Sequence, residues 1–452
     1  MEQDCICALA TPGAGGALGM VRISGKGTKD IVSRIFTPKR GTFPLPDRQV
    51  CYGDILADGQ CLDEVLLWTF SAPHSYTGED MAEISCHGSP YIQEQLLALL
   101  LQNGCRMAQP GEFTRRAFLN GKMDLSQAEA VADLIATSSK AAHQLAFSQL
   151  KGGYAQELGL LRAEFIRLAS LLELELDFSE EDVEFADRNQ LKELTSILSA
   201  KVERLIRSFR MGNALKHGIP VAIVGRPNAG KSSLLNALLA DDRAIVSPVP
   251  GTTRDTIEEC LNIEGITFRF IDTAGLRESD NEVENMGIER SRKAMEAAEI
   301  VLHVTDPRDA DNETEATLQA CETPGQKQLL VCNKEDLEET PRYGNVPQGS
   351  KAYRISALQG KGLDDLKSGI VQLTGYQGNN GEVLLTNARH YEALRNVRSA
   401  LEEVAKGLES GRTPDLLSID LRRAIWHLGS ITGEVTNNEI LGTIFSKFCV
   451  GK

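Results

Sequence analysis

The chain has 452 residues and a formal net charge of −15. A chain of this length exceeds what one core usually organises, so we expect two or three domains that fold without disulfide or metal. The acidic balance argues against indiscriminate binding to nucleic acid, because phosphate backbones are held by clustered Lys and Arg. The lack of a long apolar run and of a signal-peptide pattern predicts a cytoplasmic protein with no membrane partner. The scattered cysteines predict reduced thiols.

The charge is unevenly distributed along the chain. Acidic residues crowd the segment from Glu173 to Asp187, whereas basic residues dominate between Val21 and Val50. Those basic residues are Arg22, Lys26, Lys29, Arg34, Lys39, Arg40 and Arg48, against only Asp30 and Asp47. The acidic run is typical of a solvated surface. The basic run fits a solvated surface and a local anion-binding face equally well.

Residues 1–120 have the pattern of a compact α+β domain. Short apolar runs at Gly19–Ile23, Val65–Phe70 and Ala82–Cys86 alternate with glycine and proline, which is typical of strands and turns. One clear helix is predicted, at Ile92–Gln102.

Helix-forming residues follow from Leu125 to about Leu215, with apolar residues three and four apart and no proline. From Ile219 to about Thr374, β-branched strands alternate with helical segments, as in a parallel α/β sheet. After a polar linker, helical periodicity returns at Tyr391–Leu408, Leu416–Leu428 and Asn438–Phe448. The simplest interpretation is a helical domain made of residues 121–215 and 379–452, with an α/β domain at 216–378 inserted into it.

The inserted segment begins with a phosphate-binding motif. The strand Val221–Val224 leads into Gly225–Ser232, which reads GxxxxGKS, and then into the helix Ser233–Leu239. In such a loop the backbone N–H groups surround the phosphates, Lys231 reaches the outer phosphates and Ser232 coordinates Mg²⁺.

Two further elements follow at the positions expected of nucleotide switches. Gly251–Asp255 lies in a proline-rich loop, where a threonine would coordinate Mg²⁺ in the triphosphate state. Asp272–Gly275 follows the strand Phe268–Ile271 and reads DxxG, whose Asp supports the metal and whose Gly N–H senses the γ-phosphate.

A guanine-reading loop completes the set. The strand Gln328–Cys332 ends in Asn333-Lys334-Glu335-Asp336, and Ser356-Ala357 follow the strand Tyr353–Ile355. A carboxylate at Asp336 accepts from guanine N1–H and its 2-amino group, which adenine does not offer. These elements predict that the inserted segment is a Ras-like P-loop GTPase domain rather than a P-loop ATPase. The residues expected to bind GTP are Asn228, Ala229, Gly230, Lys231, Ser232, Ser233, Ser247, Pro248, Val249, Pro250, Gly251, Thr252, Thr253, Asp272, Thr273, Ala274, Gly275, Asn333, Lys334, Asp336, Ser356 and Ala357.

The residue after Gly275 is Leu276, where Ras-type enzymes carry the glutamine that orients the attacking water. Arg254 and Arg277 lie in switch segments but are not spaced as an obvious arginine finger. Any of the acidic residues after the DxxG element could reach the water directly or through another water, and for three of the four the expected role is only that of a solvated acidic loop. They are Glu278, Asp280, Glu282 and Glu284.

Motifs outside the GTPase segment are more specific. They are Met20–Gly25, Ser75–Asp80 with Cys86–Gly88, Pro110–Asn120 and the terminal Cys449–Lys452. With these motifs the chain resembles, from end to end, the MnmE (TrmE) family of bacterial and organellar tRNA modification GTPases. The resemblance implies a homodimer whose N-terminal domains pair and bind 5,10-methylene- or 5-formyl-tetrahydrofolate. It also implies an FAD-containing partner, MnmG or GidA, in a heterotetramer that adds a carboxymethylaminomethyl or aminomethyl group to carbon 5 of the wobble uridine of certain tRNAs.

The resemblance also implies site residues. Folate contacts fall on Arg22, Glu83, Lys122 and Lys452, K⁺ ligands on Asn228, Ser247, Val249 and Thr252, and Mg²⁺ ligands on Ser232 and Thr253. Ser247 stands where threonine is more usual, so a hydroxyl is kept. The water-orienting glutamate falls on Glu284. Cys449 is read either as a small buried apolar residue or as a thiol acting in uridine chemistry.

One alternative from another class remains at this stage. A regulatory GTPase switch that binds RNA or the ribosome without modifying it would also carry a hydrophobic residue after DxxG. Such a protein has no reason to carry the folate-site residues or the terminal CxGK sequence.

Overall fold

The computed structural model describes residues 4–12, 16–177, 188–241, 258–271, 293–306, 326–337, 351–376, 383–436, 438–446 and 448–451. The chain forms two compact units. The first contains Met1–Asp133, Gln149–Ser199 and Asn396–Lys452, and the second contains Leu134–Ser148 and Ala200–Arg395. Within the described part of the chain, no helix is both long enough and apolar enough to cross a membrane.

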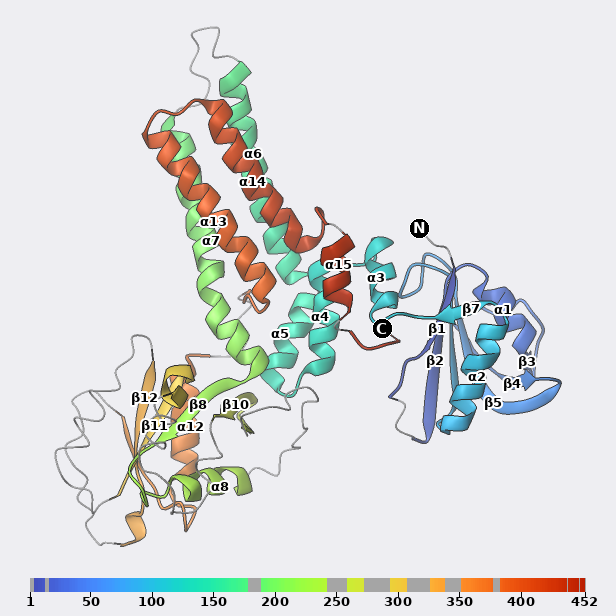
Figure 1. The fold of residues 1–452 in the computed structure, drawn as a ribbon, viewed down its shortest axis with the longest axis horizontal. Coiled ribbons are helices and arrows are strands. Elements are labelled where there is room, and N and C mark those ends of the chain that lie inside the picture. The colour runs from blue at the N-terminus through green and yellow to red at the C-terminus, as the bar shows by residue number, and fades with distance from the viewer. Residues whose placement is uncertain are drawn as a thin grey trace. The chain divides into compact units, whose positions relative to one another are not determined.

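The N-terminal part of the first unit is a seven-stranded sheet in the order β3-β4-β5-β6-β2-β1-β7. Its strands are β1 (Cys5–Leu9), β2 (Leu18–Ser24), β3 (Phe36–Pro38), β4 (Val50–Ala57), β5 (Gln60–Phe70), β6 (Met81–His87) and β7 (Cys105–Met107). Neighbouring strands are antiparallel except β1 and β7. Val21 and Ile23 are buried in one core with residues of α1 (Thr28–Ile35) and α2 (Pro90–Gln102), which lie against the sheet (Figure 1). Because side chains alternate along a strand, Arg22 points to the opposite face.

The N-terminal part contains more helices than the one predicted from the sequence. The structure contains α2 at the predicted place, and also α1 and α3 (Glu112–Leu119). Each of the two additional helices has only eight residues. That length is too short for an apolar period to stand out from the sequence, and both helices follow a glycine in the left-handed conformation, Gly27 and Gly111.

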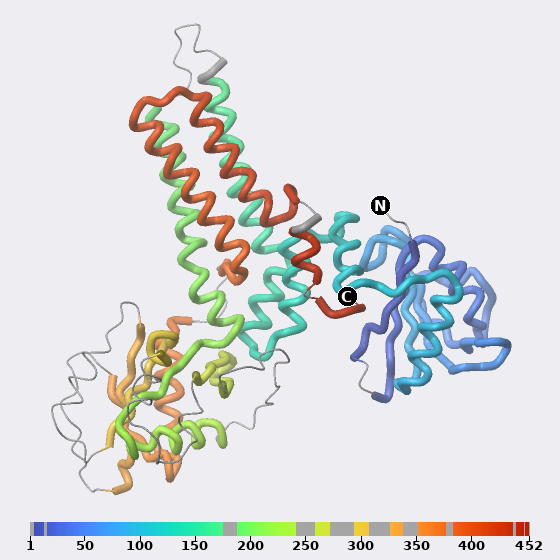
Figure 2. Tube along the Cα trace, in the orientation of Figure 1, coloured from blue at the N-terminus to red at the C-terminus, as the bar shows by residue number. Residues whose placement is uncertain are grey.

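Long helices from two distant segments of the chain pack together. The helices are α4 (Leu125–Ala136), α5 (Lys140–Leu150), α6 (Gly153–Asp177), α7 (Arg188–His217), α13 (Ala388–Glu409), α14 (Pro414–Thr432) and α15 (Asn438–Phe445). α14 packs along α6, and α13 contacts α7 through the stacked rings of Phe209 and Tyr391, so the C-terminal segment runs beside the earlier one (Figure 2). α15 packs on α4 in a core that includes Leu125, Leu441 and Phe445.

The second unit contains a six-stranded sheet in the order β13-β12-β11-β8-β10-β9, parallel except for the pair β9 and β10. Its strands are β8 (Ile219–Val224), β9 (Glu259–Ile263), β10 (Ile266–Phe270), β11 (Ile300–Thr305), β12 (Lys327–Cys332) and β13 (Ala352–Arg354). The helices described between β8 and β13 and directly after them include α8 (Lys231–Asp241), η1 (Glu335–Leu337) and α12 (Leu363–Thr374). β8 and β11 are almost continuously apolar and buried, as expected for central parallel strands. The predicted Ras-like α/β domain is therefore present, entered from α7 and left towards α13.

Candidate functional site

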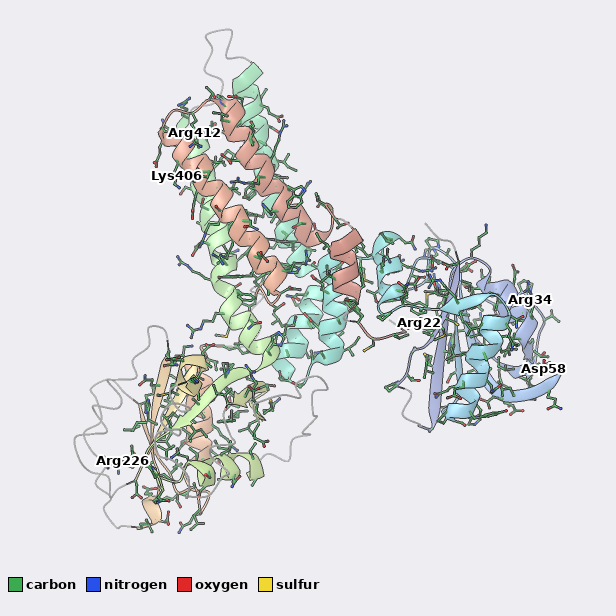
Figure 3. The ribbon with its side chains drawn as sticks, in the orientation of Figure 1. Arg22, Arg34, Asp58, Arg226, Lys406 and Arg412 are labelled. Atoms are coloured by element: carbon green, nitrogen blue, oxygen red, sulfur yellow. The ribbon has the colours of Figure 1, made fainter. Side chains whose placement is uncertain are left out.

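The phosphate-binding loop joins β8 to α8 as the sequence predicts. Gly225 has φ +151° and Gly230 has φ +93°, and a Cβ at Gly225 would lie 2.2 Å from the carbonyl oxygen of Val304 on β11. The Lys231 ammonium lies 2.9 Å and 2.8 Å from the carbonyl oxygens of Gly225 and Arg226, so its positive charge lies within the loop. Arg226, a residue of the same loop, is exposed (Figure 3).

The guanine-reading residues lie at the carboxyl ends of β12 and β13. The Asp336 carboxylate, on η1, accepts a hydrogen bond from the Ser356 hydroxyl. The Asn333 side-chain oxygen accepts from the backbone N–H of Ala357 at 3.0 Å. Asp336 is exposed and Asn333 is 2% exposed, so one side chain faces outward while the other organises the loops beneath it.

Asn333 and Lys334 connect this base loop to the phosphate loop. The Asn333 amide donates to the carbonyl oxygen of Ala229 at 3.0 Å. The Lys334 ammonium donates to the carbonyl oxygen of Asn228 and pairs with the buried Asp306 carboxylate at 2.6 Å. Asn228 has φ +63°, a conformation that asparagine tolerates better than most residues, and its side chain is exposed.

Several residues expected from the sequence to act at this site lie outside the described residues. They are Ser247, Pro248, Val249, Pro250, Gly251, Thr252, Thr253, Asp272, Thr273, Ala274, Gly275 and Glu284, with the alternatives Arg254, Arg277, Glu278, Asp280 and Glu282. Among the residues that are described, no group of three or more His, Cys, Asp or Glu side chains is arranged to hold a metal ion. The magnesium and potassium ligands expected here are instead hydroxyl, amide and carbonyl groups.

A second site forms on the N-terminal sheet. Arg22 on β2 and Glu83 on β6 are paired in the sheet register, and the guanidinium lies 2.8 Å from the carboxylate. The Arg22 guanidinium also lies over the rings of Tyr76 and Phe113, at 5.3 Å and 5.7 Å from their centres. Lys122 follows α3, and its ammonium donates to the carbonyl oxygen of Pro73 at 2.9 Å.

The C-terminal segment reaches this second site. The Gly111 N–H donates to the carbonyl oxygen of Cys449 at 3.3 Å, and Arg22 donates to the carbonyl oxygen of Gly451 at 3.3 Å. A Cβ at Gly451, which has φ +100°, would lie 2.4 Å from the carbonyl oxygen of Leu9. Only glycine therefore permits this close approach. The Cys449 side chain is exposed, so its interpretation as a buried apolar residue is wrong. Lys452 lies outside the described residues.

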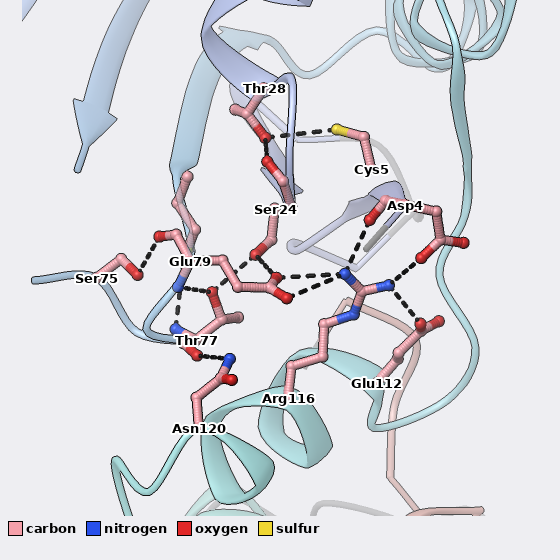
Figure 4. Close-up of polar contacts among 12 residues, drawn as sticks. Asp4, Cys5, Ser24, Thr28, Ser75, Thr77, Glu79, Glu112, Arg116 and Asn120 are labelled. Atoms are coloured by element: carbon pink, nitrogen blue, oxygen red, sulfur yellow. Dashed lines mark hydrogen bonds and ion pairs between the residues drawn. The ribbon is translucent and has the colours of Figure 1, made fainter. Parts of the chain in front are cut away.

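The sequence did not single out the charged residues beneath the second site. Arg116 on α3 contacts the carboxylates of Asp4, Glu79 and Glu112 (Figure 4). Arg106 on β7 pairs with Asp4 and Glu112. Burial raises the pKa of Glu112, but hydrogen bonds from Arg106, the Gln109 backbone and Arg116 outweigh burial, and the net pKa is lowered. Glu79, Glu112 and Arg116 all fall within motifs that the sequence analysis quoted, but no sequence signal links them to Asp4.

The phosphate and base loops together are typical of one class of protein. A glycine-rich loop between a buried parallel strand and a helix, tied to Asn-Lys-x-Asp and Ser-Ala elements at neighbouring strand ends, is the site of a P-loop GTPase. A family model described as MnmE helical domain matches residues 125–449, and one described as GTP-binding protein TrmE N-terminus matches residues 5–122. The chain belongs to the MnmE family of tRNA modification GTPases, and it is a GTP hydrolase.

Curated relatives match along the whole chain. The tRNA modification GTPase MnmE of Bacteroides thetaiotaomicron is 49% identical over 469 residues, with 100% of both chains covered. That of Cytophaga hutchinsonii is 48% identical over 453 residues, covering 100% of this chain and 98% of the relative. Among solved structures, the G domain of the T. maritima FeoB iron transporter is 23% identical, covering 35% of this chain and 99% of that one, with a TM-score of 0.26. Era in complex with MgGDPNP and a 16S ribosomal RNA fragment is 28% identical, covering 40% and 65%, with a TM-score of 0.26.

Proposed function

We propose that this GTPase is activated by K⁺ and acts with an FAD-containing partner subunit on the wobble uridine of certain tRNAs. The modification is addition of a carboxymethylaminomethyl or aminomethyl group at carbon 5. The protein works as a cytoplasmic homodimer within a heterotetramer, and its N-terminal domain binds 5,10-methylene- or 5-formyl-tetrahydrofolate. When bound, the folate supplies the one-carbon unit.

The observation that carries this proposal is the contact of Arg22 with both Glu83 and the C-terminal Gly451 carbonyl. A folate presents N–H donors on its pterin ring, which suit the Glu83 carboxylate, and glutamate carboxylates, which suit Arg and Lys. Both kinds of group are present here, with aromatic rings from Tyr76 and Phe113 beside them. The terminal CxGK segment lies against the same site, which brings the Cys449 backbone next to Gly111. A role in folate binding accounts for these contacts better than a purely structural role for the Arg22–Glu83 ion pair. A structural ion pair would need neither the C-terminal CxGK segment nor the two aromatic rings.

The nucleotide site supports the K⁺ part of the proposal. Charge develops between the β- and γ-phosphates during hydrolysis, and a cation placed there substitutes for an arginine finger. The exposed side chain of Asn228 is in the phosphate loop, and its amide oxygen is a suitable K⁺ ligand. Ser247, Val249 and Thr252 would supply the remaining K⁺ ligands, Ser232 and Thr253 would hold Mg²⁺, and Glu284 would orient the water.

An exposed apolar row on the N-terminal sheet supports the homodimer. Val50, Tyr52 and Leu66 are 54%, 48% and 40% exposed. Tyr52 and Leu66 are register partners on β4 and β5, and Val50 lies two residues from Tyr52, so all three lie on one face. Grouped apolar side chains on a sheet face favour burial against another surface, and in this proposal that surface is the second N-terminal domain.

Titration calorimetry with 5-formyl-tetrahydrofolate tests the folate assignment. We expect the unmodified protein to bind and Arg22→Ala and Glu83→Ala to bind at least ~10-fold more weakly, the loss expected from removing a charged hydrogen bond. Arg34→Ala is the matched control, because Arg34 is an exposed arginine of the same domain at a different position (Figure 3). Equal binding by all four proteins would refute the assignment.

A further inference from the structure

Arg116 brings together three acidic side chains from three separate segments. Its guanidinium lies 2.7 Å from the Asp4 carboxylate, 2.9 Å from Glu112 and 3.2 Å from Glu79 (Figure 4). It also donates to the carbonyl oxygen of Asp4 at 2.9 Å. The Arg116 side chain is 8% exposed. A cation so deeply buried and so fully paired fixes the segments that contact it.

One of those segments is the loop at residues 75–80. Glu79, which Arg116 contacts, accepts a hydrogen bond from the Ser24 hydroxyl at 2.8 Å, and that hydroxyl lies 2.7 Å from Thr77 Oγ1. Asn120, one turn after Arg116 on the same side of α3, donates to the carbonyl oxygen of Thr77 at 2.8 Å (Figure 4). These contacts attach the loop to Arg116 on α3, to Asn120 at the C-terminal end of that helix and to Ser24 on β2.

The same loop carries one of the aromatic rings next to Arg22. The Tyr76 hydroxyl lies 2.8 Å from Thr114 Oγ1 on α3, and the Arg22 guanidinium lies over the Tyr76 ring. Phe113, the second ring, is itself on α3. The surroundings of Arg22 therefore depend on α3 and the loop staying together.

Removing the positive charge of Arg116 would separate them. The cluster contains the carboxylates of Asp4, Glu79 and Glu112 and the guanidiniums of Arg106 and Arg116. Without Arg116, Glu79 has no cation among these contacts and faces two other carboxylates in a partly buried place. Like charges there repel strongly because the local dielectric is low. The Glu79 end of the loop is the part that moves most easily, since Asp4 and Glu112 keep Arg106.

We infer that Arg116 is a positioning residue for the site formed by Arg22 and Glu83: it holds the loop at residues 75–80 against α3 and so fixes the surroundings of Arg22. The inference rests on the proposed function, because folate is the ligand whose binding would depend on that geometry. Arg116 itself does not contact Arg22 or Glu83 in any of the contacts described above.

Two variants separate positioning from general stability. Arg116→Met removes the charge that contacts Glu79, whereas Arg106→Gln removes a charge that contacts Asp4 and Glu112 but no residue of the loop. We expect Arg116→Met to increase amide hydrogen exchange at residues 75–80 and to weaken 5-formyl-tetrahydrofolate binding ~10-fold or more. Arg106→Gln should change neither. Arg116→Lys should be intermediate, because one ammonium cannot serve three carboxylates.

The results distinguish failure of this inference from failure of the proposed function. If the unmodified protein binds no folate, the folate assignment fails, and exchange at residues 75–80 still tests the role of Arg116. If Arg116→Met does not fold, Glu79→Gln removes the same ion pair at the loop while keeping side-chain size, and the same changes are expected. Unchanged loop exchange in a folded variant, or folate affinity equal to that of the unmodified protein, overturns the inference. Equal effects of Arg106→Gln and Arg116→Met would also overturn it.

Discussion

The side-chain amide of Asn333 donates to the carbonyl oxygen of Ala229, and its oxygen accepts from the backbone of Ala357. One buried side chain thus joins the phosphate loop, the base-reading loop and the loop after β13. A Cβ at Gly230 would lie 2.2 Å from the Asn333 amide nitrogen, so the loops approach as closely as glycine permits. A substitution at Asp336 removes none of these Asn333 contacts.

Asp336→Asn should change base specificity. The carboxylate matches two guanine donors, and an amide would present one of them with another donor, which leaves polar groups unpaired. We expect GTP affinity to fall on the order of 10- to 100-fold and xanthosine triphosphate binding to appear. Competition binding with both nucleotides measures this. Unchanged GTP affinity would show that Asp336 does not read the base.

The K⁺ proposal predicts a cation-specific rate. Hydrolysis should be fast in K⁺ and slow in Na⁺ at equal ionic strength, and Asn228→Ala should abolish the difference. Arginine fingers contribute on the order of 10³ to 10⁵ in rate, so a substituting ion should have a large effect. Phosphate release in the two salts measures it. Equal rates in both salts would refute the mechanism and direct attention to Arg254 or Arg277.

Glu284→Ala should separate water positioning from ion binding. This variant should still bind nucleotide and still dimerise with a transition-state mimic, but hydrolyse slowly. A variant that hydrolyses at the normal rate would exclude Glu284, and the neighbouring acidic residues Glu278, Asp280 and Glu282 would then be tested in turn.

Cys449 gives a prediction specific to tRNA chemistry. Its thiol is exposed, and its backbone is held beside the N-terminal domain. Cys449→Ser should abolish tRNA modification while leaving GTP hydrolysis unchanged, because the nucleotide site lies in the other compact unit. Cys61→Ser is a control, since Cys61 is also an exposed thiol of the first unit. Normal modified uridine in the Cys449 variant would remove this thiol from the mechanism.

A buried histidine predicts how the GTPase sheet responds to acid. His303 on β11 is 4% exposed, and burial lowers its pKa to about 4 against an ordinary value of 6.5, despite a hydrogen bond with Gln328. Between these values the unfolded chain binds a proton that the folded sheet does not. Stability should therefore fall as pH drops from 6.5 towards 4, by up to about 1.4 kcal/mol per pH unit.

Calorimetry can follow this effect in the full chain, because nucleotide binding raises the unfolding temperature of the domain that binds it. The transition that GDP shifts is the one to follow from pH 7 to pH 4. His303→Leu should flatten its pH dependence. An unchanged slope in that variant would show that other groups control the acid response.

Much of the nucleotide site could be predicted from the sequence because its chemistry is local. The strand, loop and helix around Lys231 are contiguous, and Asn333 and Asp336 follow directly from a strand end. The N-terminal site depends instead on register and tertiary contact. Nothing in the sequence pairs Arg22 with Glu83, and Asp4 lies 112 residues from Arg116.

The contacts of the C-terminal segment could not be predicted from sequence patterns either. The position of this segment near Arg22 depends on how α15 packs. That helix packs on α3 and α4, and Gly111 and Gly451 permit the close contacts that follow. The sequence does not predict such close contacts, because they depend on the relative positions of two segments that are far apart in the chain.

The central claim is that this chain uses GTP hydrolysis and its N-terminal site to modify wobble uridines. The most direct test is mass spectrometry of tRNA nucleosides from a deletion strain carrying the unmodified chain, Asp336→Asn or Arg22→Ala. We predict that the carboxymethylaminomethyl or aminomethyl uridine is lost on deletion, restored by the unmodified chain and not restored by either variant. Normal levels of the modified uridine in the deletion strain would contradict the claim.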